Sequence, residues 1–200
     1  AKRSRSAHSA MDLPPGAGPL MADALRASME RDFAQAEEKY REILRQDENN
    51  VYVLAHLANA QFAEGHLEDC EKTVDRALAL DPDDPASLYL LGVLRYRQEK
   101  LDEALVALSR SAQLNSTNAG TQNYLGCVLA DKGMRPAAET ALRKALQLEP
   151  DYPDAHYNLA FIYATEKPPS PELARWHYKR AVDLGHAKSP SLETVLAGEK

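Results

Sequence analysis

Three side chains that can bind a metal ion lie close together in this sequence: His56, His66 and Cys70. Imidazole and thiolate groups are typical zinc ligands, but a closed zinc site needs about four of them and no fourth candidate lies nearby. His56 is expected on one helix and His66 in the turn that follows, so the spacing does not bring the two rings together. We therefore interpret Cys70 as a small core residue and expect no metal here.

Two acidic turns, at residues 47–50 and 81–84, offer the carboxylate oxygens that calcium prefers. Neither turn has the loop of about 12 residues, with a central glycine and a final glutamate, that typical calcium sites require. A simpler interpretation is that each turn ends one helix and favours the start of the next, where carboxylates meet the positive end of the helix dipole.

The sequence also lacks the short patterns that accompany common catalytic sites. It contains no His-Glu-x-x-His, no phosphate-binding glycine loop, no Gly-x-Ser-x-Gly and no Cys-x-x-Cys pair. We therefore expect no enzymatic activity, no catalytic residue and no cofactor.

Charge and hydropathy restrict the partners and the compartment. The chain has 200 residues and a formal net charge of −6, which argues against a nucleic-acid partner because such proteins usually present a basic face. No apolar run reaches the roughly 18–20 residues of a membrane-spanning helix. The chain begins at Ala1 without an initiator methionine, which fits a processed protein or a fragment. The compartment stays open: we prefer the cytoplasm, and a periplasmic or membrane-anchored protein would follow if an upstream segment had been removed.

The elements that must position any site form a repeat. In residues 51–84, apolar positions recur at spacings of three and four on both sides of Gly65, which predicts two amphipathic helices joined by a tight turn. Pro82 ends the second helix because proline cannot continue it. The pattern returns every 34 residues, in 85–118 and 119–152. Equivalent positions hold similar residues: Leu57, Leu91 and Leu125; Ala58, Gly92 and Gly126; Cys70, Ala104 and Ala138.

A helix–turn–helix unit of this length, with an early Leu-Gly pair and a final proline, resembles the tetratricopeptide repeat (TPR). The resemblance covers about residues 17–188 and implies an all-α, right-handed α-solenoid of about five repeats with a short C-terminal capping helix. We predict a flexible basic Pro/Gly linker at 1–19, a repeat region at 20–187 and a capping helix at 188–200. The predicted repeats are 17–50, 51–84, 85–118, 119–152 and 153–187.

The C-terminal part of the sequence has two further features. Three prolines in residues 167–171 predict a longer, stiffer turn in the last repeat, which is either a contact point or a tolerated insertion. Ser189 or Ser191 is expected to cap the final helix, with Pro190 in its first turn. Three apolar residues would then cover the edge of the last repeat: Leu192, Val195 and Leu196.

The resemblance also implies where a partner would bind, because the first helices of TPR superhelices line a concave groove. Carried onto this sequence, the groove positions are Tyr52, Asn59, Phe62, Tyr89, Val93, Tyr96, Arg97, Asn123, Cys127, Asp131, Asp154, Tyr157, Phe161 and Thr165, with Tyr124 at the margin. Tyrosine combines apolar area with a polar tip at small entropic cost, which suits a protein-contact surface. The alternative is that several of these rings pack between helices as core residues.

Two binding variants known in the family are not supported by the residues at their positions. A carboxylate clamp requires lysine, asparagine and further basic residues, of which only Asn59 is present. An asparagine ladder requires asparagine at the sixth position of each repeat, where Asn158 alone matches.

The sequence thus predicts a non-enzymatic scaffold or adaptor for protein–protein interaction. Its partner would be another protein or peptide, bound as an apolar helix or extended segment in the aromatic groove. Two alternatives remain open at this point. The chain could self-associate into a homo-oligomer through its repeat ends, or it could be the regulatory or interaction arm of a larger enzyme or of a secretion or envelope complex.

Overall fold

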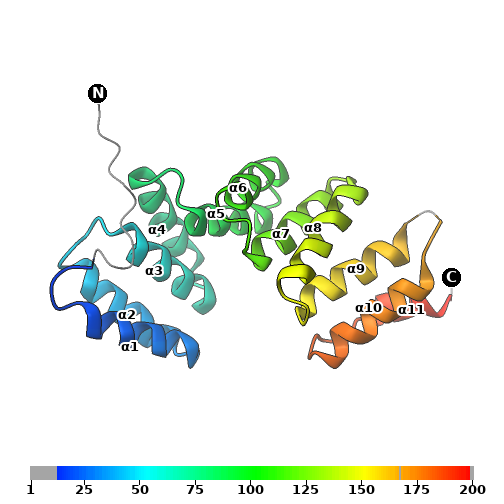
Figure 1. Ribbon diagram of the computed structural model, residues 1–200, viewed down its shortest axis with the longest axis horizontal. Coiled ribbons are helices and arrows are strands. Elements are labelled where there is room, and N and C mark those ends of the chain that lie inside the picture. Colours follow the sequence, from blue (N-terminus) through cyan, green and yellow to red (C-terminus); the bar gives the residue numbers. More distant parts are fainter. Residues whose placement is uncertain (1–12, 167, 199–200) are drawn as a thin grey trace. The chain divides into compact units, whose positions relative to one another are not determined.

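The computed structural model describes residues 13–166 and 168–198 (Figure 1). Over these residues the chain forms eleven α-helices and no β-strand. The predicted fold class, an all-α helical-repeat solenoid, is confirmed. No described helix has both the length and the apolar character needed to cross a membrane.

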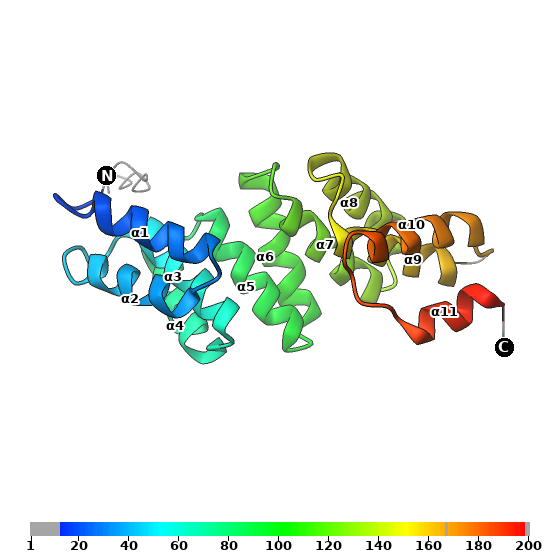
Figure 2. The ribbon, with the colours of Figure 1, turned by 90° about the horizontal axis from the view of Figure 1, so that it is seen from below.

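Ten of the helices follow one another as five pairs joined by short turns (Figures 1 and 2). The first helices of the pairs are α1 (Gly18–Met29), α3 (Val51–Glu64), α5 (Pro85–Arg97), α7 (Ala119–Asp131) and α9 (Pro153–Thr165). The second helices are α2 (Phe33–Leu44), α4 (Leu67–Leu80), α6 (Leu101–Leu114), α8 (Arg135–Leu148) and α10 (Pro171–Asp183). A shorter helix, α11 (Pro190–Ala197), follows the last pair.

The acidic turns begin helices, as the sequence indicated. The Oδ1 atom of Asn50 accepts a hydrogen bond from the Val53 backbone N–H at 3.1 Å. In the next turn Asp84 accepts one from the Ser87 N–H at 2.7 Å. Each bond satisfies a backbone donor that has no partner inside its own helix. At the other end of α3, Gly65 has a φ of 84°, a left-handed conformation that closes the helix and that glycine adopts without strain.

The helices form two compact units, which divide within α5. Unit 1 runs to Leu94 and unit 2 starts at Arg95. In unit 1, one core cluster joins α1, α2 and α3 around Tyr40 and Leu54, and a second joins α3, α4 and α5 around Val74. The second cluster includes Cys70, which is fully buried as predicted.

The predicted linker at 1–19 is only partly described, because residues 1–12 lie outside the described residues. The rest differs from a flexible linker. Leu13 packs against the core of unit 1, Ala17 is fully buried, and α1 begins at Gly18. A proline in the first turn of α1 fits this early start, since its missing N–H would have no helical partner there.

In unit 2, α7 and α8 pack tightly at Gly126. A Cβ atom built on Gly126 would lie 2.5 Å from Leu142 Cγ, well inside contact distance. Only a residue without a side chain therefore permits this packing distance.

The last helix, α11, begins as predicted. Ser189 caps it by accepting a hydrogen bond from the Leu192 N–H at 3.4 Å, and the Leu192 side chain is buried against Ala160 and Tyr178. The Tyr178 hydroxyl accepts a hydrogen bond from the Ser189 N–H at 2.8 Å and donates one to Glu193 at 3.1 Å. The prediction for Val195 was wrong, because this side chain is 49% exposed and is not part of the core packed around Leu192.

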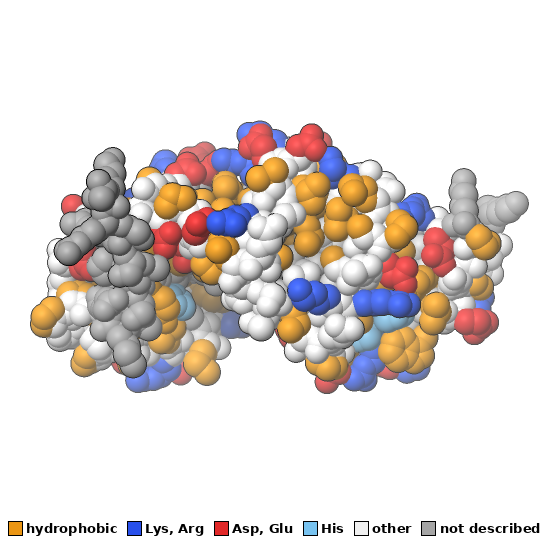
Figure 3. All heavy atoms as spheres, turned by 45° about the horizontal axis from the view of Figure 1, so that its top comes forward, with side chains coloured by type: hydrophobic (Ala, Val, Ile, Leu, Met, Phe, Trp, Pro, Cys, Tyr) orange, Lys and Arg blue, Asp and Glu red, His pale blue; other side chains and the backbone are white. Residues whose placement is uncertain are grey.

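The surface of the described residues carries both signs of charge. Acidic and basic side chains are interspersed on the face shown in Figure 3, with hydrophobic side chains between them. On this face, neither sign of charge forms a continuous patch.

Candidate functional site

A small cavity of about 100 Å³ in unit 2 brings together residues from α5, α7 and α9. Five of its lining residues were predicted to face a groove: Tyr96, Cys127, Asp131, Phe161 and Thr165. They come from three first helices because the repeat places equivalent helix positions on the same side of successive pairs. The cavity is the most specific candidate site among the predicted residues.

Tyr96 forms one wall of this cavity and is tied to the next first helix. Its hydroxyl donates a hydrogen bond to Asp131 Oδ2 at 2.8 Å. Its ring meets that of Tyr124 edge-on, with centroids 6.1 Å apart. Burial, followed by the hydrogen bond to Asp131, raises the pKa of Tyr96, so its hydroxyl stays protonated and remains a donor. The predicted margin residue Tyr124 is thus half-buried beside Tyr96.

Asn158 also lines the cavity, and its side-chain amide contacts two residues of α7. The Nδ2 atom donates to Asn123 Oδ1 at 2.9 Å and lies 3.1 Å from Cys127 Sγ. Burial raises the pKa of the Cys127 thiol to about 12, which keeps it protonated and weakly nucleophilic. This position therefore offers a small packing surface and no covalent chemistry.

Asn123 differs from the prediction of an open groove residue. It is only 3% exposed, and its side-chain oxygen is used by Asn158. Cys127, another predicted groove position, is half-buried and lines the cavity. The sequence could not distinguish the two cases, because the pairing depends on a residue one repeat further along.

Phe161 is the exposed apolar group at this cavity. Half of its surface (50%) is accessible to solvent, which is unusual for a phenylalanine. Beside it, the Thr165 hydroxyl accepts a hydrogen bond from Arg135 Nη1 at 3.2 Å. Arg97, at the end of α5, is also exposed.

Tyr157 has a neighbour that the sequence did not indicate. Its ring stacks on His186, with centroids 4.2 Å apart and an angle of 14° between the ring planes. His186 also lies 3.8 Å from Asp154. The histidine follows α10, outside the first helices on which the predicted groove positions lie, so no repeat position could have revealed the contact.

The predicted groove residues of unit 1 are less open. Tyr52 is half-buried and meets His56 edge-on, with centroids 4.5 Å apart. Phe62 and Tyr89 are half-buried against the core cluster around Val74. The alternative of core packing therefore applies to these three rings in part. Asn59 is exposed.

The His56, His66 and Cys70 set forms no common site. His56 stacks on Tyr40 at 5.6 Å, and burial lowers its pKa. His66 Nδ1 lies 3.3 Å from Glu37 Oε2, and Cys70 is in the core. In the part of the chain that the structure describes, no three His, Cys, Asp or Glu residues are grouped so that they could hold a metal ion.

Comparison with known families identifies the repeat. Residues 27–94 match a family model described as tetratricopeptide repeat, and residues 128–166 match a second one described as TPR repeat. The chain belongs to the tetratricopeptide-repeat family. The TPR matches lie in both units, on the helix pairs described above.

Curated TPR-containing relatives share part of this chain. The cytochrome c-type biogenesis protein CycH of Rhizobium meliloti is 32% identical over 121 residues, which is 59% of this chain and 31% of that protein. The peroxisomal targeting signal receptor of Candida glabrata is 32% identical over 87 residues, 44% of this chain and 14% of the receptor. The chain thus spans less than a third of the length of either relative.

Solved structures show the same TPR fold at low identity. A crystal structure of MamA matches with a TM-score of 0.62 and 24% identity, covering 80% of this chain and 93% of MamA. YrrB, described as a TPR protein with an unusual peptide-binding site, matches at 0.61 and 22%, covering 92% and 91%. The Cut9–Hcn1 structure gives 0.79 and 20%, covering 90% of this chain and 36% of the matched one. These likenesses establish the fold.

Proposed function

We propose that this TPR chain is a non-enzymatic scaffold that binds a segment of a partner protein over the unit 2 cavity. The TPR fold and the relatives support a protein-interaction role in general. The observation that carries the more specific proposal is the convergence of Tyr96, Cys127, Asp131, Phe161 and Thr165 on one cavity. Half-exposed Phe161 adds apolar area beside the cavity that a partner side chain could cover.

The cavity suits one apolar side chain of a partner. Its volume of about 100 Å³ is close to that of an aliphatic side chain, and Phe161 and Ile162 supply apolar contact. The Tyr96 hydroxyl donates to Asp131, so this carboxylate keeps one hydrogen bond when a partner covers the cavity. We propose that the partner presents a short apolar helix or extended segment, with polar contacts at the rim through Thr165 and Arg97.

The remaining predicted groove residues are proposed to contact the partner as well, although they line no cavity described above. They are Tyr52, Asn59, Phe62, Tyr89 and Tyr157. The peroxisomal relative supports peptide binding by its name, that of a receptor for a targeting signal.

The test is a quantitative capture experiment with the full chain on the resin. Extract proteins retained by the wild type are compared with those retained by Phe161→Ala and by the control Leu173→Ala, a 46% exposed apolar residue on α10. A partner that depends on the site should be retained by the wild type and by the control, and should not be retained by Phe161→Ala. Its measured affinity for Phe161→Ala should be at least tenfold weaker. Equal affinity of all three proteins for a purified partner would show that the cavity is not its binding site.

A further inference from the structure

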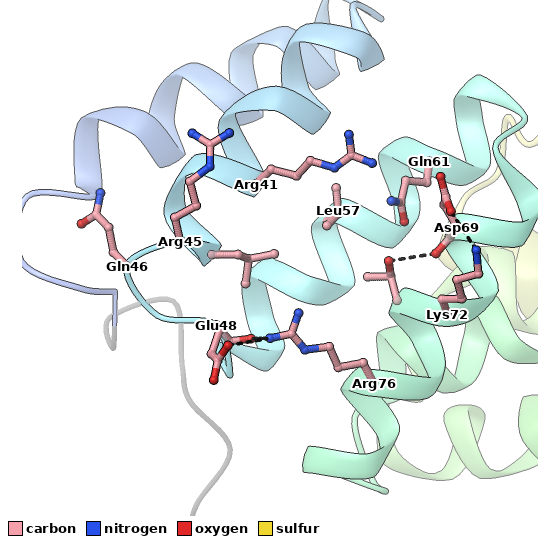
Figure 4. Close-up of a pocket in the computed structure, with 11 residues that line it drawn as sticks. Arg41, Arg45, Gln46, Glu48, Leu57, Gln61, Asp69, Lys72 and Arg76 are labelled. Atoms are coloured by element: carbon pink, nitrogen blue, oxygen red, sulfur yellow. Dashed lines mark hydrogen bonds and ion pairs between the residues drawn. The ribbon is translucent and has the colours of Figure 1, made fainter.

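Unit 1 contains a larger hollow on different helices. The end of α2 and the facing sides of α3 and α4 enclose a volume of about 810 Å³ (Figure 4). Leu57 and Gln61 of α3 lie between the two flanking helices. Arg41 and Arg45 line the α2 side, and Lys72 and Arg76 line the α4 side. The volume falls in the range of about 300–1,000 Å³ that is typical of ligand sites.

The lining of this α2–α3–α4 hollow is basic in a chain that is acidic overall. Four cationic and two anionic side chains line it, against a net charge of −6 for the whole protein. Arg41 pairs with Glu37 at 2.6 Å, and Arg76 reaches the main-chain oxygen of Glu48. The Arg45 side chain is exposed and makes no hydrogen bond or ion pair with any described residue. At least one cation is therefore open to an anionic partner.

Gln61 adds a second, independent sign of an absent ligand. The residue is only 2% exposed, and its Oε1 atom has no hydrogen-bond partner among the described residues. In Figure 4 its amide lies on the wall of the hollow, near Leu57. A buried amide oxygen without a donor is unfavourable, and most such groups in proteins are satisfied. A primary amide can accept from a backbone N–H and donate to a backbone C=O, so a peptide group complements it.

We propose that the α2–α3–α4 hollow is a second binding site, which takes an acidic peptide segment of a partner protein. The carboxylates of the segment pair with Arg45 and its cationic neighbours, a main-chain amide pairs with Gln61, and an apolar side chain packs on Leu57. An inorganic anion would use the cations and leave the apolar surface and the Gln61 oxygen unmatched. The site shares no residue with the unit 2 cavity, so it does not depend on the proposed function.

The hollow is not a necessary result of the repeat. At the position corresponding to Gln61 three repeats later, α9 carries Tyr163, which is 3% exposed and hydrogen-bonded to both Glu139 and Arg143. At this position unit 2 therefore carries a hydrogen-bonded ring, whereas unit 1 carries an amide oxygen without a partner among the described residues.

The test measures binding of defined peptides by fluorescence anisotropy, with the full chain. The probes are fluorescein-labelled ten-residue peptides in which pairs of Asp or Glu, at varied spacing, flank one leucine. Matched peptides carry Asn and Gln in place of the acids. We expect at least one acidic probe to bind with a Kd below about 100 μM and its amide counterpart to bind at least tenfold more weakly. If no acidic probe binds in this range, the proposal is wrong.

Three variants locate the binding. Arg45→Glu, at an unpaired exposed residue, and Gln61→Tyr, which places an aromatic ring in the hollow, should each weaken binding tenfold or more. Lys188→Glu makes the same charge change at an exposed residue far along the chain in unit 2 and should change the Kd less than twofold. Circular dichroism melts verify that each variant is folded.

Three other results would contradict the proposal. Equal weakening by Lys188→Glu and Arg45→Glu would indicate attraction by overall charge. Inorganic phosphate at millimolar concentration is added as a competitor to the wild type and to Gln61→Tyr. If the same phosphate concentration displaces the probe from both proteins, the hollow is a simple anion site. A loss of probe binding with Phe161→Ala would place the peptide at the unit 2 cavity, whereas unchanged binding keeps the two proposals separate.

Discussion

The α2–α3–α4 hollow of unit 1 and the matching region of unit 2, between α8, α9 and α10, use the same repeat positions in opposite ways. Arg41 corresponds to Arg143 and Gln61 to Tyr163, three repeats later. On the second helix, Thr73 corresponds to His177 once the longer turn before α10 is allowed for. Unit 1 leaves a space there, whereas unit 2 fills it with aromatic rings.

In unit 2 the filling is tied together by hydrogen bonds. The Tyr163 hydroxyl donates to Glu139 Oε1 at 2.7 Å and accepts from Arg143 Nη2 at 3.0 Å. His156 Nε2 must donate to the Pro150 carbonyl, at 3.0 Å, because that oxygen only accepts. His156 Nδ1 is then the acceptor for His177 Nδ1–H, at 2.9 Å.

The comparison shows that the polar partners, as well as the ring volume, differ between the two regions. Arg143 has the Tyr163 hydroxyl and the Glu139 carboxylate as partners, whereas its counterpart Arg41 pairs with the equivalent carboxylate, Glu37, and has no phenol beside it. Tyr163 is satisfied, whereas the Gln61 oxygen is not. A solenoid of near-identical backbones can thus carry a structural contact in one repeat and an open surface in another.

The largest expected effect comes from emptying the filled region. Tyr163→Ala removes a buried ring and both of its hydrogen bonds, so it should lower the free energy of unfolding of unit 2 by about 3–5 kcal/mol. Trp176, the only tryptophan of the sequence, lies beside His177 with ring centroids 4.7 Å apart, so its fluorescence reports urea unfolding there. Tyr163→Phe keeps the ring and should cost only about 1 kcal/mol. If Tyr163→Ala cost less than Tyr163→Phe, the ring would not be filling the region.

The features that the sequence predicts correctly are those that depend on residues close together along the chain. The helices and their caps depend on neighbours within four residues, and the 34-residue period repeats that information, so Asn50, Ser189 and Leu192 behave as the sequence indicated. The fate of Asn123 depends on Asn158, and that of Tyr157 depends on His186. Such pairs join different helices, and no spacing rule specifies which side chain turns inward.

The hollow itself was not predicted for a related reason. Its existence requires that Gln61, Thr73 and Arg41 together be too small or too extended to fill the space between three helices. Each of them separately is an ordinary helix residue. The unpaired state of the Gln61 amide appears only when all of its neighbours are known.

The second expected effect is a pH dependence of the stability of unit 2. Burial, then the neighbouring His156 and Arg143, lowers the pKa of His177 from 6.5 to about 4. The unfolded chain therefore binds a proton that the folded chain does not, so stability is complete above pH 6.5 and falls as the pH drops toward 4. We expect a loss of about 2 kcal/mol between pH 7 and pH 4.5, followed by Trp176 fluorescence.

Two variants sharpen this measurement. His177→Gln should reduce the pH dependence between 7 and 4.5, because the histidine whose pKa is lowered to about 4 is gone while His156 remains. His66→Gln, in unit 1, should leave the Trp176 signal as it is in the wild type. An unchanged slope in His177→Gln would assign the effect to other groups.

The smallest expected effect concerns the open region. Gln61→Met replaces a buried, unpaired amide by an apolar side chain of similar length, so it should stabilise unit 1 by about 1 kcal/mol. Protection of α3 amides from hydrogen exchange would measure this change. Gln46→Met, the same substitution at an exposed residue lining the hollow, should be near neutral. A destabilised Gln61→Met would mean that the amide already has a partner, and the contrast with Tyr163 would disappear.

The mode of attachment of α11 has a consequence for anyone who wishes to lengthen this array. Leu192 occupies the apolar face of α9 and α10, and the Tyr178 hydroxyl is saturated by the backbone and side chain of the same short helix. A grafted repeat would have to displace α11 from that face. Engineered fusions should therefore replace the chain from Ser189 onward and supply both a leucine and a partner for Tyr178.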